Sequence, residues 1–122
     1  MQYMLLVYGE PGRWESATQE ERNEVRARYV ALAAELREHE AYVDGGELED
    51  VATATTVRVV GDETEVTDGP FAETKEALGG YFLIEAESLD EAIGWAAKIP
   101  AASHGAVEVR PLVAMREAEV SA

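Results

Sequence analysis

The sequence predicts an α+β fold in which one antiparallel sheet has the split βαβ, or ferredoxin-like, arrangement. Three observations predict it: apolar or alternating runs typical of strands, two segments with apolar residues at helical spacing, and the order of these segments along 122 residues. That order is strand, helix, strand, hairpin, strand, helix, strand, and without the hairpin it becomes β-α-β-β-α-β. We therefore predict one domain over residues 1–115 and a tail at 116–122.

The first strand and helix are the clearest predicted elements. Residues 3–8 are continuously apolar, as expected for a strand buried on both faces, and a Gly-Glu-Pro-Gly stop follows. Thr18 then precedes a helix that should run to about residue 40, with Glu21 completing a capping box. The predicted buried face consists of Val25, Tyr29, Leu32 and Leu36.

The middle of the chain predicts strands and a hairpin. A short strand at 42–48 should carry a bulge or turn at its Gly pair. Strands at 55–60 and 65–67 are joined by a Gly-Asp-Glu turn, and 80–86 is another apolar strand.

A second helix and a last strand complete the pattern. Ser88 should cap this helix in a capping box with Glu91, and Pro100 should end it. The predicted inner face consists of Leu89, Ala92, Ile93 and Ala96. The last strand, 106–113, contains Pro111, which suits a sheet edge or rim.

The predicted sheet has helices on one face only, and the chain has no third helix to cover the other. A second copy packed face to face is the economical solution, so we expect a homodimer. The sequence leaves open which parity of each strand faces outward. Candidate positions for the hidden face are Met4, Leu6, Phe82, Ile84, Val107 and Val109.

The composition excludes several function classes. A net charge of −15 argues against binding to nucleic acid or to an anionic membrane surface. The absence of Cys excludes disulfides and thiolate sites, and the two His residues lack the spacing of a zinc site. Neither common Gly-rich phosphate loop is present, so we predict no cofactor and no metal. No signal peptide or membrane span is predicted, which favours the cytoplasm.

Residues 68–76, Asp-Gly-Pro-Phe-Ala-Glu-Thr-Lys-Glu, form an unusual segment between two predicted strands. Its turn residues should fix the backbone and give Phe71 one approach to the core. Residues 72–78 are predicted to form about one helical turn that Gly79 ends. The segment is either a pocket-lining loop, with Glu73 and Lys75 as binding groups, or a rigid surface turn whose charges face water.

This segment and several others, in the same order, resemble the DGPF branch of the YCII-related family. The matching segments are residues 3–6, 53–58, 68–76, 78–85, 89–92, 95–97 and 104–111. The resemblance implies a dimeric α+β barrel, in agreement with the strand-count argument, and implies no established activity.

The wider YCII family implies a His/Asp pair for proton transfer, with the His on the first helix. One such relative is a dehydrochlorinase of a chlorinated aromatic breakdown product. Here the middle of that helix carries Tyr29, and its one His, His39, lies near the C-terminal end. We therefore do not transfer the pair to this chain, and the helix dipole is a sufficient reason for His39.

His104 is the first candidate for catalysis. It lies between the second helix and the last strand, beside Gly105, and an imidazole is suited to general acid/base chemistry. The alternative is a His that bonds a backbone carbonyl and fixes the loop. Asp44 and Asp68 flank Gly residues at strand ends and either orient His104 or form turns.

Candidate binding residues come from the strands and loops. Arg58 and Arg110 either hold a substrate carboxylate or form salt bridges between strands, with Glu85 or Glu108. Tyr81, Trp14 and Phe71 either line an apolar cleft or pack in the core. A small anionic or aromatic ligand fits this set.

Two functions follow. The first is a cofactor-independent lyase or isomerase that uses His104 as its acid/base. The second is a non-catalytic ligand-binding or regulatory dimer linked to an extracytoplasmic-function sigma factor system, as the family resemblance implies. Converging titratable groups in a pocket favour the enzyme, and a large exposed apolar patch favours the partner-binding dimer.

Overall fold

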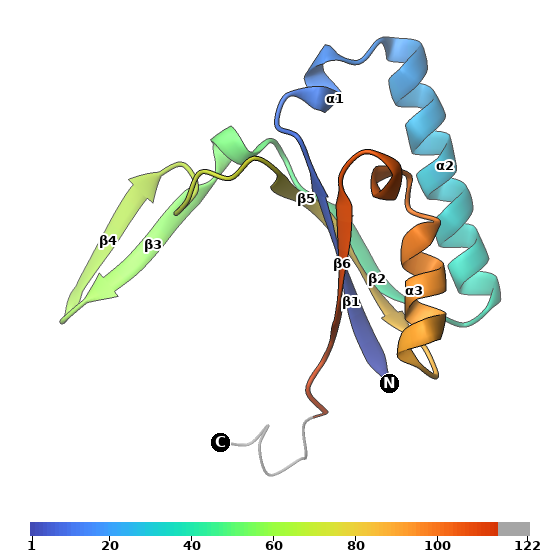
Figure 1. The fold of residues 1–122 in the computed structure, drawn as a ribbon. Helices are drawn as coiled ribbons and strands as arrows, with labels where there is room; N and C mark the ends of the chain where they lie inside the picture. The colour runs from blue at the N-terminus through green and yellow to red at the C-terminus, as the bar shows by residue number, and fades with distance from the viewer. Residues whose placement is uncertain (115–122) are drawn as a thin grey trace.

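The computed structural model describes residues 1–114 and has the predicted split βαβ arrangement. Four antiparallel strands form the main sheet in the order β2-β5-β1-β6. They are β1 (Gln2–Gly9), β2 (Tyr42–Glu47), β5 (Ala77–Glu85) and β6 (Ala106–Pro111). The long helix α2 (Gln19–Glu38) and the shorter α3 (Leu89–Ala97) lie on the same side of this sheet (Figure 1). The predicted tail at 116–122 lies outside the described residues.

Three short elements were not predicted. They are α1 (Arg13–Ser16), η1 (Val51–Thr53) and η2 (Pro100–Ser103). Pro100 occupies the start of η2, a position that needs no backbone N–H, so it opens a new turn two residues after α3 is capped by Lys98.

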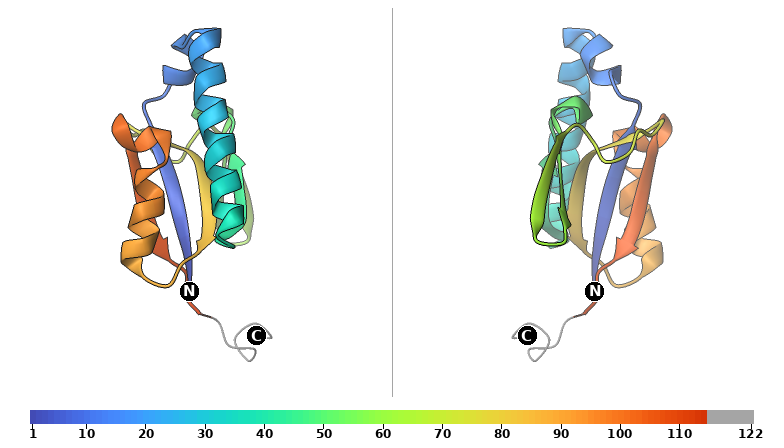
Figure 2. Two further views of the ribbon diagram at one scale, coloured as in Figure 1. Left: turned by 90° about the vertical axis from the view of Figure 1, so that its right-hand side faces the viewer. Right: turned by 90° about the vertical axis from the view of Figure 1, so that its left-hand side faces the viewer.

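The remaining strands, β3 (Thr55–Val60) and β4 (Glu63–Asp68), form a separate two-stranded sheet. We call this hairpin, residues 55–68, the arm. It projects from the body on the side of the main sheet opposite to the helices (Figures 1 and 2). Its base is held by two hydrogen bonds at Gly69, whose N–H donates to Ala54 O (2.7 Å) and whose carbonyl accepts from Thr56 Oγ1 (2.8 Å).

The core lies between the sheet and the two helices. Alternate residues of β1, Tyr3, Leu5 and Val7, are buried there, and Leu32 and Leu36 of α2 cover them. Tyr29 and Val25 of α2 are half-buried, so the predicted inner face of this helix is confirmed. The prediction that β1 is buried on both faces is wrong, because Met4 and Leu6 remain half-exposed on the outer face.

The strand parity corrects our list of positions on the outer face. Phe82 and Ile84 belong to the buried core, and Val107 and Val109 pack against it, so these four point toward the helices. Met4 and Leu6 remain on the outer face, where Leu83 of β5 lies directly opposite Met4. Both faces of these strands are apolar, which is why alternation alone did not decide the direction.

Helix α3 also presents a different face from the one predicted. Ala92 and Ala96 are buried as expected, but Leu89 and Ile93 are each 49% exposed. Trp95, which we did not include, is buried instead. The large indole fills the space beside α2, and this rotates the covered stripe of α3 away from Ile93.

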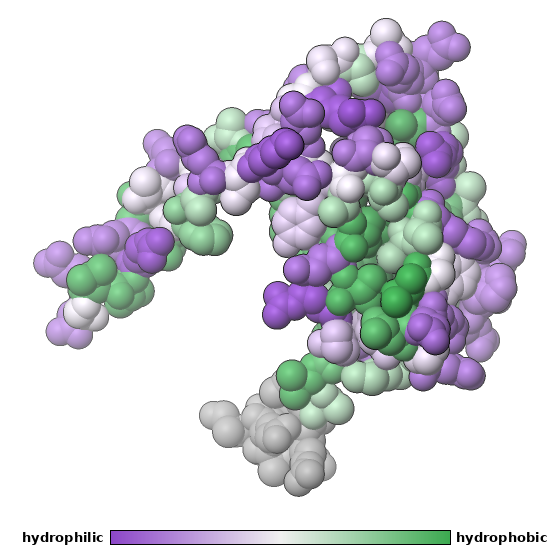
Figure 3. All heavy atoms as spheres, in the orientation of Figure 1, coloured by the Kyte–Doolittle hydropathy of each residue, from purple (hydrophilic) through white to green (hydrophobic). Residues whose placement is uncertain are grey.

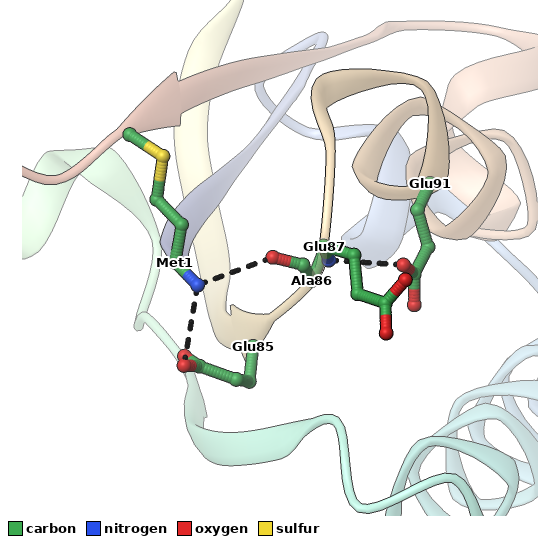
Figure 4. A network of polar contacts seen from close by, with 5 residues as sticks. All are labelled: Met1, Glu85, Ala86, Glu87 and Glu91. Atoms are coloured by element: carbon green, nitrogen blue, oxygen red, sulfur yellow. Dashed lines mark hydrogen bonds and ion pairs between the residues drawn. The ribbon is translucent and has the colours of Figure 1, made fainter.

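The two helix starts differ in their caps. At α2 the predicted capping box is complete: Glu21 N–H donates to Thr18 Oγ1 (3.1 Å) and Thr18 N–H donates to Glu21 Oε1 (3.2 Å). At α3 Glu91 N–H donates to Ser88 Oγ (3.2 Å), but the Glu91 carboxylate accepts from Glu87 N–H (2.9 Å) and not from the cap residue (Figure 4). The predicted Ser88 cap is therefore present, but the return hydrogen bond from Glu91 to the cap residue is not.

The same view shows how the start of β1 is tied to the end of β5. The amino group of Met1 donates to Glu85 Oε1 (3.3 Å) and to Ala86 O (3.2 Å) (Figure 4). Both groups are half-exposed, so this ion pair contributes little to stability by itself.

Two expectations for residues 68–79 are wrong. Phe71 is 78% exposed and does not reach the core. No helical turn forms at 72–78, because β5 begins at Ala77 and continues through Gly79 into its pairing with β1. Two flanking strands satisfy the backbone of β5, and this outweighs the local helical preference. The bulge of β2 lies between Tyr42 and Asp44, just before the Gly pair.

Candidate functional site

His104 lies where η2 ends and β6 is about to begin, beside the end of β1. Its backbone N–H donates to Ala101 O (3.2 Å), and Gly105 N–H donates to the same oxygen (2.7 Å). The backbone of Gly105 packs directly against β1, so that a Cβ at this position would lie 2.2 Å from Tyr8 O. The expected close approach at Gly105 is therefore present, and the approaching group is the β1 backbone.

Two arginines share the surroundings of His104. The pKa of His104 is lowered, first because packing removes part of its solvent and then because Arg13 and Arg28 place positive charge nearby. Arg13 belongs to α1 and Arg28 to α2, so three separate elements supply the cluster of Arg13, Arg28 and His104. At neutral pH the imidazole is accordingly neutral and able to accept a proton.

Tyr29 connects this cluster to the core. Its hydroxyl lies near the backbone of Ala101, the residue whose carbonyl also holds the His104 loop. Its ring stacks on Phe82 with centroids 6.3 Å apart and planes inclined by 14°. The pKa of Tyr29 is raised, mainly by burial and also by the charge of Glu47 at the end of β2. Tyr29 therefore stays protonated at neutral pH and retains an O–H donor.

Trp14 fixes α1, and with it Arg13, against α2. The guanidinium of Arg26 lies 5.1 Å from the centroid of the Trp14 ring, and that of Arg22 lies 6.0 Å away. Arg22 also donates to the carbonyls of Trp14 (3.0 Å) and Glu15 (2.8 Å). The described contacts of Trp14 are therefore packing contacts with the arginines of α2.

Asp44 and Tyr81 form a second, smaller group. Tyr81 Oη donates to Asp44 Oδ2 (3.5 Å), and the other carboxylate oxygen of Asp44 accepts from Gly45 N–H (2.8 Å). Asp44 is exposed on edge strand β2, and the groups that shift the pKa of His104 do not include it. Its described contacts are those of a turn-forming residue.

The other predicted residues lie elsewhere. Arg58 is opposite Glu65 in the arm, and Asp68 ends the arm opposite Thr55. Phe71, Glu73 and Lys75 are exposed in the segment before β5. Arg110 is exposed on β6 opposite Met4, and the ion pair that Glu85 makes is with the Met1 amino group. No hydrogen bond within residues 1–114 joins any of these side chains to His104. Their binding roles stay predictions.

Sequence reasoning missed Arg13 and Arg28. The available signal was their clustering: Arg13, Arg22, Arg26 and Arg28 are four of only ten basic residues, and they fall within one short stretch of a chain with 25 acidic residues. The proximity of that stretch to His104 depends on tertiary packing, so the spacing of residues along the chain does not predict it.

His39 has the structural surroundings expected for it. Its Nδ1 lies 2.9 Å from Glu35 O, and its ring meets Trp95 edge-on at 5.3 Å. These residues and Lys98, which pairs with Glu35, line a shallow depression of about 380 Å³ between α2 and α3. Over residues 1–114, no three His, Cys, Asp or Glu side chains gather as a metal-binding group, and no helix is long and apolar enough to span a membrane.

Comparison with known families settles the lineage of the chain. The YCII-related domain matches residues 1–116. The chain belongs to the YCII-related family. An uncharacterised protein of Rhizobium meliloti is 38% identical to this YCII-related protein over 98% of both chains.

A solved enzyme structure is similar in fold to this YCII-related protein. It is the 5-chloro-2-hydroxyhydroquinone dehydrochlorinase of Burkholderia phenoliruptrix, in complex with 2,5-dihydroxybenzoquinone. The TM-score is 0.53 at 19% sequence identity, and 93% of this chain and 94% of that chain are covered. The similarity confirms the α+β, ferredoxin-like fold.

The electrostatics of the cluster make a prediction about its titration. We expect His104 to titrate below the ordinary histidine pKa of about 6.5, because the neutral ring is favoured beside two guanidinium groups. Since the folded pKa lies below the unfolded pKa, the unfolded chain binds the extra proton first as the pH falls. The stability contributed by neutral His104 is therefore full above about pH 6.5 and declines below it.

Titration of the His104 ring by NMR measures this directly. Arg28→Gln should raise the pKa of His104, whereas Arg110→Gln, on the sheet face, should leave it unchanged. An unshifted His104 in the wild type, or equal effects of the two substitutions, would contradict the proposed cluster.

Proposed function

We propose that this protein is a cytoplasmic, cofactor-independent lyase or isomerase for a small anionic molecule, with neutral His104 as the proton acceptor. The observation that supports the proposal best is the convergence of Arg13, Arg28 and His104 from three elements. In a chain with a net charge of −15, two arginines beside an imidazole form a local site where an anion is attracted and not repelled.

In this proposal each group has one task. Arg13 and Arg28 hold the anionic group of the substrate, and their planar guanidinium groups suit a carboxylate or a phenolate-like oxygen. His104 removes a proton from the adjacent carbon, and the electron pair of that C–H bond forms the new double bond. In a lyase an anionic leaving group departs, and in an isomerase the proton returns to another atom of the same molecule.

Tyr29 supplies a neutral hydrogen-bond donor next to this site. Its raised pKa keeps the hydroxyl protonated, and the hydroxyl lies near the Ala101 backbone, which belongs to the turn that carries His104. The dehydrochlorinase with the same fold was solved with a hydroxylated quinone. This supports the choice of anionic hydroxyquinones and aromatic carboxylates as the first ligands to test.

A thermal-shift screen on four proteins tests the proposal: wild type, His104→Gln, Arg13→Gln and the control His39→Gln. A ligand at 100 times its Kd stabilises the folded state by about 2.7 kcal/mol, which corresponds to a rise of several degrees in Tm. We expect this rise in the wild type and the His39 variant, and a much smaller rise in the Arg13 variant.

Turnover of the same ligand then separates catalysis from binding. His104→Gln should lower kcat by about 10²- to 10⁴-fold, because it removes the general base. If His104→Gln retains wild-type turnover, His104 is not the base. Binding without turnover in the wild type would favour the non-catalytic ligand-binding dimer.

We also propose that the protein is a homodimer through the outer face of the main sheet. No helix covers this face within the described residues (Figure 2, right), and it presents half-exposed Met4, Leu6 and Leu83. An apolar sheet face is normally covered by a second layer. Light scattering during size-exclusion chromatography should give about twice the mass of the 13.3 kDa chain.

A further inference from the structure

The arm leaves a set of apolar side chains uncovered. Val57, Val59, Val60 and Val66 are 58–68% exposed, so these valines lie almost entirely in solvent in the single chain. A two-stranded hairpin is at best marginally stable alone in water, because it has no second layer to pack against. The arm therefore depends on contacts that one copy of the chain does not provide.

These valines are divided unequally between the two faces of the arm. Val57 is paired directly with Val66, and Val59 with Thr64. Because side chains alternate along a strand, these four residues share one face, which we call the valine face. The opposite face carries Arg58 paired with Glu65, and Val60 paired with Glu63. The arm is thus amphipathic: one side suits a protein surface and the other suits water.

We propose that the valine face of each arm docks on a second copy of this chain. The arm projects on the side of the main sheet opposite to the helices, which is also the side of the uncovered sheet face (Figures 1 and 2). A two-fold axis that brings two sheets together therefore also carries each arm toward the other copy.

Charge favours the valine face as the contact. With 25 acidic residues, two copies of this chain repel each other over most of their surfaces. The valine face carries no charged side chain from Val57 to Thr64, and its one charge, Asp68, lies at the base of the arm opposite Thr55. The opposite face carries Glu63, Glu65 and Arg58. Figure 3 shows an apolar patch near the tip of the arm with hydrophilic residues around it. A second acidic copy can approach there without burying like charges.

The area needed for a stable dimer points the same way. Four strands about 4.8 Å apart and about 20–30 Å long give the main sheet a flat extent of about 400–550 Å². Stable interfaces bury about 800 Å² on each partner. The valine face, about 20 Å by 10 Å, adds about 200 Å² on each side, so each arm brings the contact closer to the usual size.

The test compares a triple variant with a single control. Val57→Thr, Val59→Thr and Val66→Thr together make the valine face polar without changing its shape, and Thr is a good strand former, so the hairpin should persist. Val60→Thr makes the same chemical change on the opposite face at similar exposure. Analytical ultracentrifugation gives the dimer Kd, and circular dichroism checks that each variant is folded.

We expect the triple variant to raise the dimer Kd by at least tenfold and Val60→Thr to change it by less than twofold. This inference rests on the proposed dimer but not on the proposed chemistry. If the wild type is a monomer, both the dimer and the docking arm are wrong. If the wild type is a dimer and the triple variant has the same Kd, the docking arm alone is wrong.

A photo-crosslinker distinguishes docking on the second copy from folding back on the same chain. The chain has no Cys, so Val57→Cys offers a unique attachment point for a benzophenone maleimide, with Val60→Cys as its control. Irradiation should give an adduct of twice the chain mass from position 57 and much less from position 60. Adducts confined to single chains would overturn the proposal.

Discussion

Gly105→Ala should lower the stability of the region around His104 more than a substitution at an exposed position. The new Cβ would lie 2.2 Å from Tyr8 O and 3.2 Å from Gly9 Cα, and both are backbone atoms that a rotamer change cannot move aside. The backbone dihedrals of Gly105 are not in the left-handed region, so the cost comes from the contact itself. We expect a loss of about 3 kcal/mol, at the upper end of the usual cost of overpacking.

Ligand binding should be lost as well, because the pairing of Tyr8 with Ala106 fixes the loop that carries His104. Chemical denaturation and the thermal-shift assay measure the two effects. Gly94→Ala is the matched control, since its Cβ would meet nothing within 4 Å. Helix α3 should gain up to about 1 kcal/mol from that change. Equal effects of the two substitutions would show that Gly105 does not pack on β1 as described.

Ile84→Ala should produce the other large effect. Ile84 is fully buried in β5, between β1 and β2, and it belongs to the main core. Removing three carbons there loses transfer free energy and leaves a cavity that rigid strands cannot close. The expected cost is about 2–5 kcal/mol of the free energy of unfolding.

The control for this change is Ile93→Ala in α3. Ile93 is 49% exposed, so the same deletion should alter stability by about 0.5 kcal/mol or less. Urea denaturation monitored by circular dichroism compares the two. A larger loss for Ile93 than for Ile84 would mean that the predicted inner face of α3 is correct after all and that the burial described above is wrong.

The fold was predictable because its signals are local. The capping residues Thr18 and Ser88, the apolar strands and the turn residues of the hairpin each act within a few positions, and their order defines the topology. The errors arise where local signals were ambiguous. Phe71 was expected in the core because it is the one large apolar residue of its segment, but nothing in the sequence specifies which way that loop faces.

The site was less predictable because its geometry is not local. His104 was identified from its chemistry, but its charged neighbours Arg13 and Arg28 come from elements distant in sequence. Arg58 and Arg110 were predicted on strands, either as anion anchors or in salt bridges, and the structure places them on the arm and on an edge strand. Tertiary packing, in which η2 contacts α2 and β1, is what places His104 near these arginines.

The two border strands of the main sheet carry features that bear on pairing with a strand of another chain. Strand β6 ends at Pro111, which lacks a backbone N–H, and β2 is interrupted by its bulge before Asp44. Neither border offers an uninterrupted row of backbone donors and acceptors to a passing strand. These two features disfavour the addition of a further strand at the borders of the main sheet. In the proposed dimer, association uses the outer face of the main sheet, where a single two-fold contact closes the assembly.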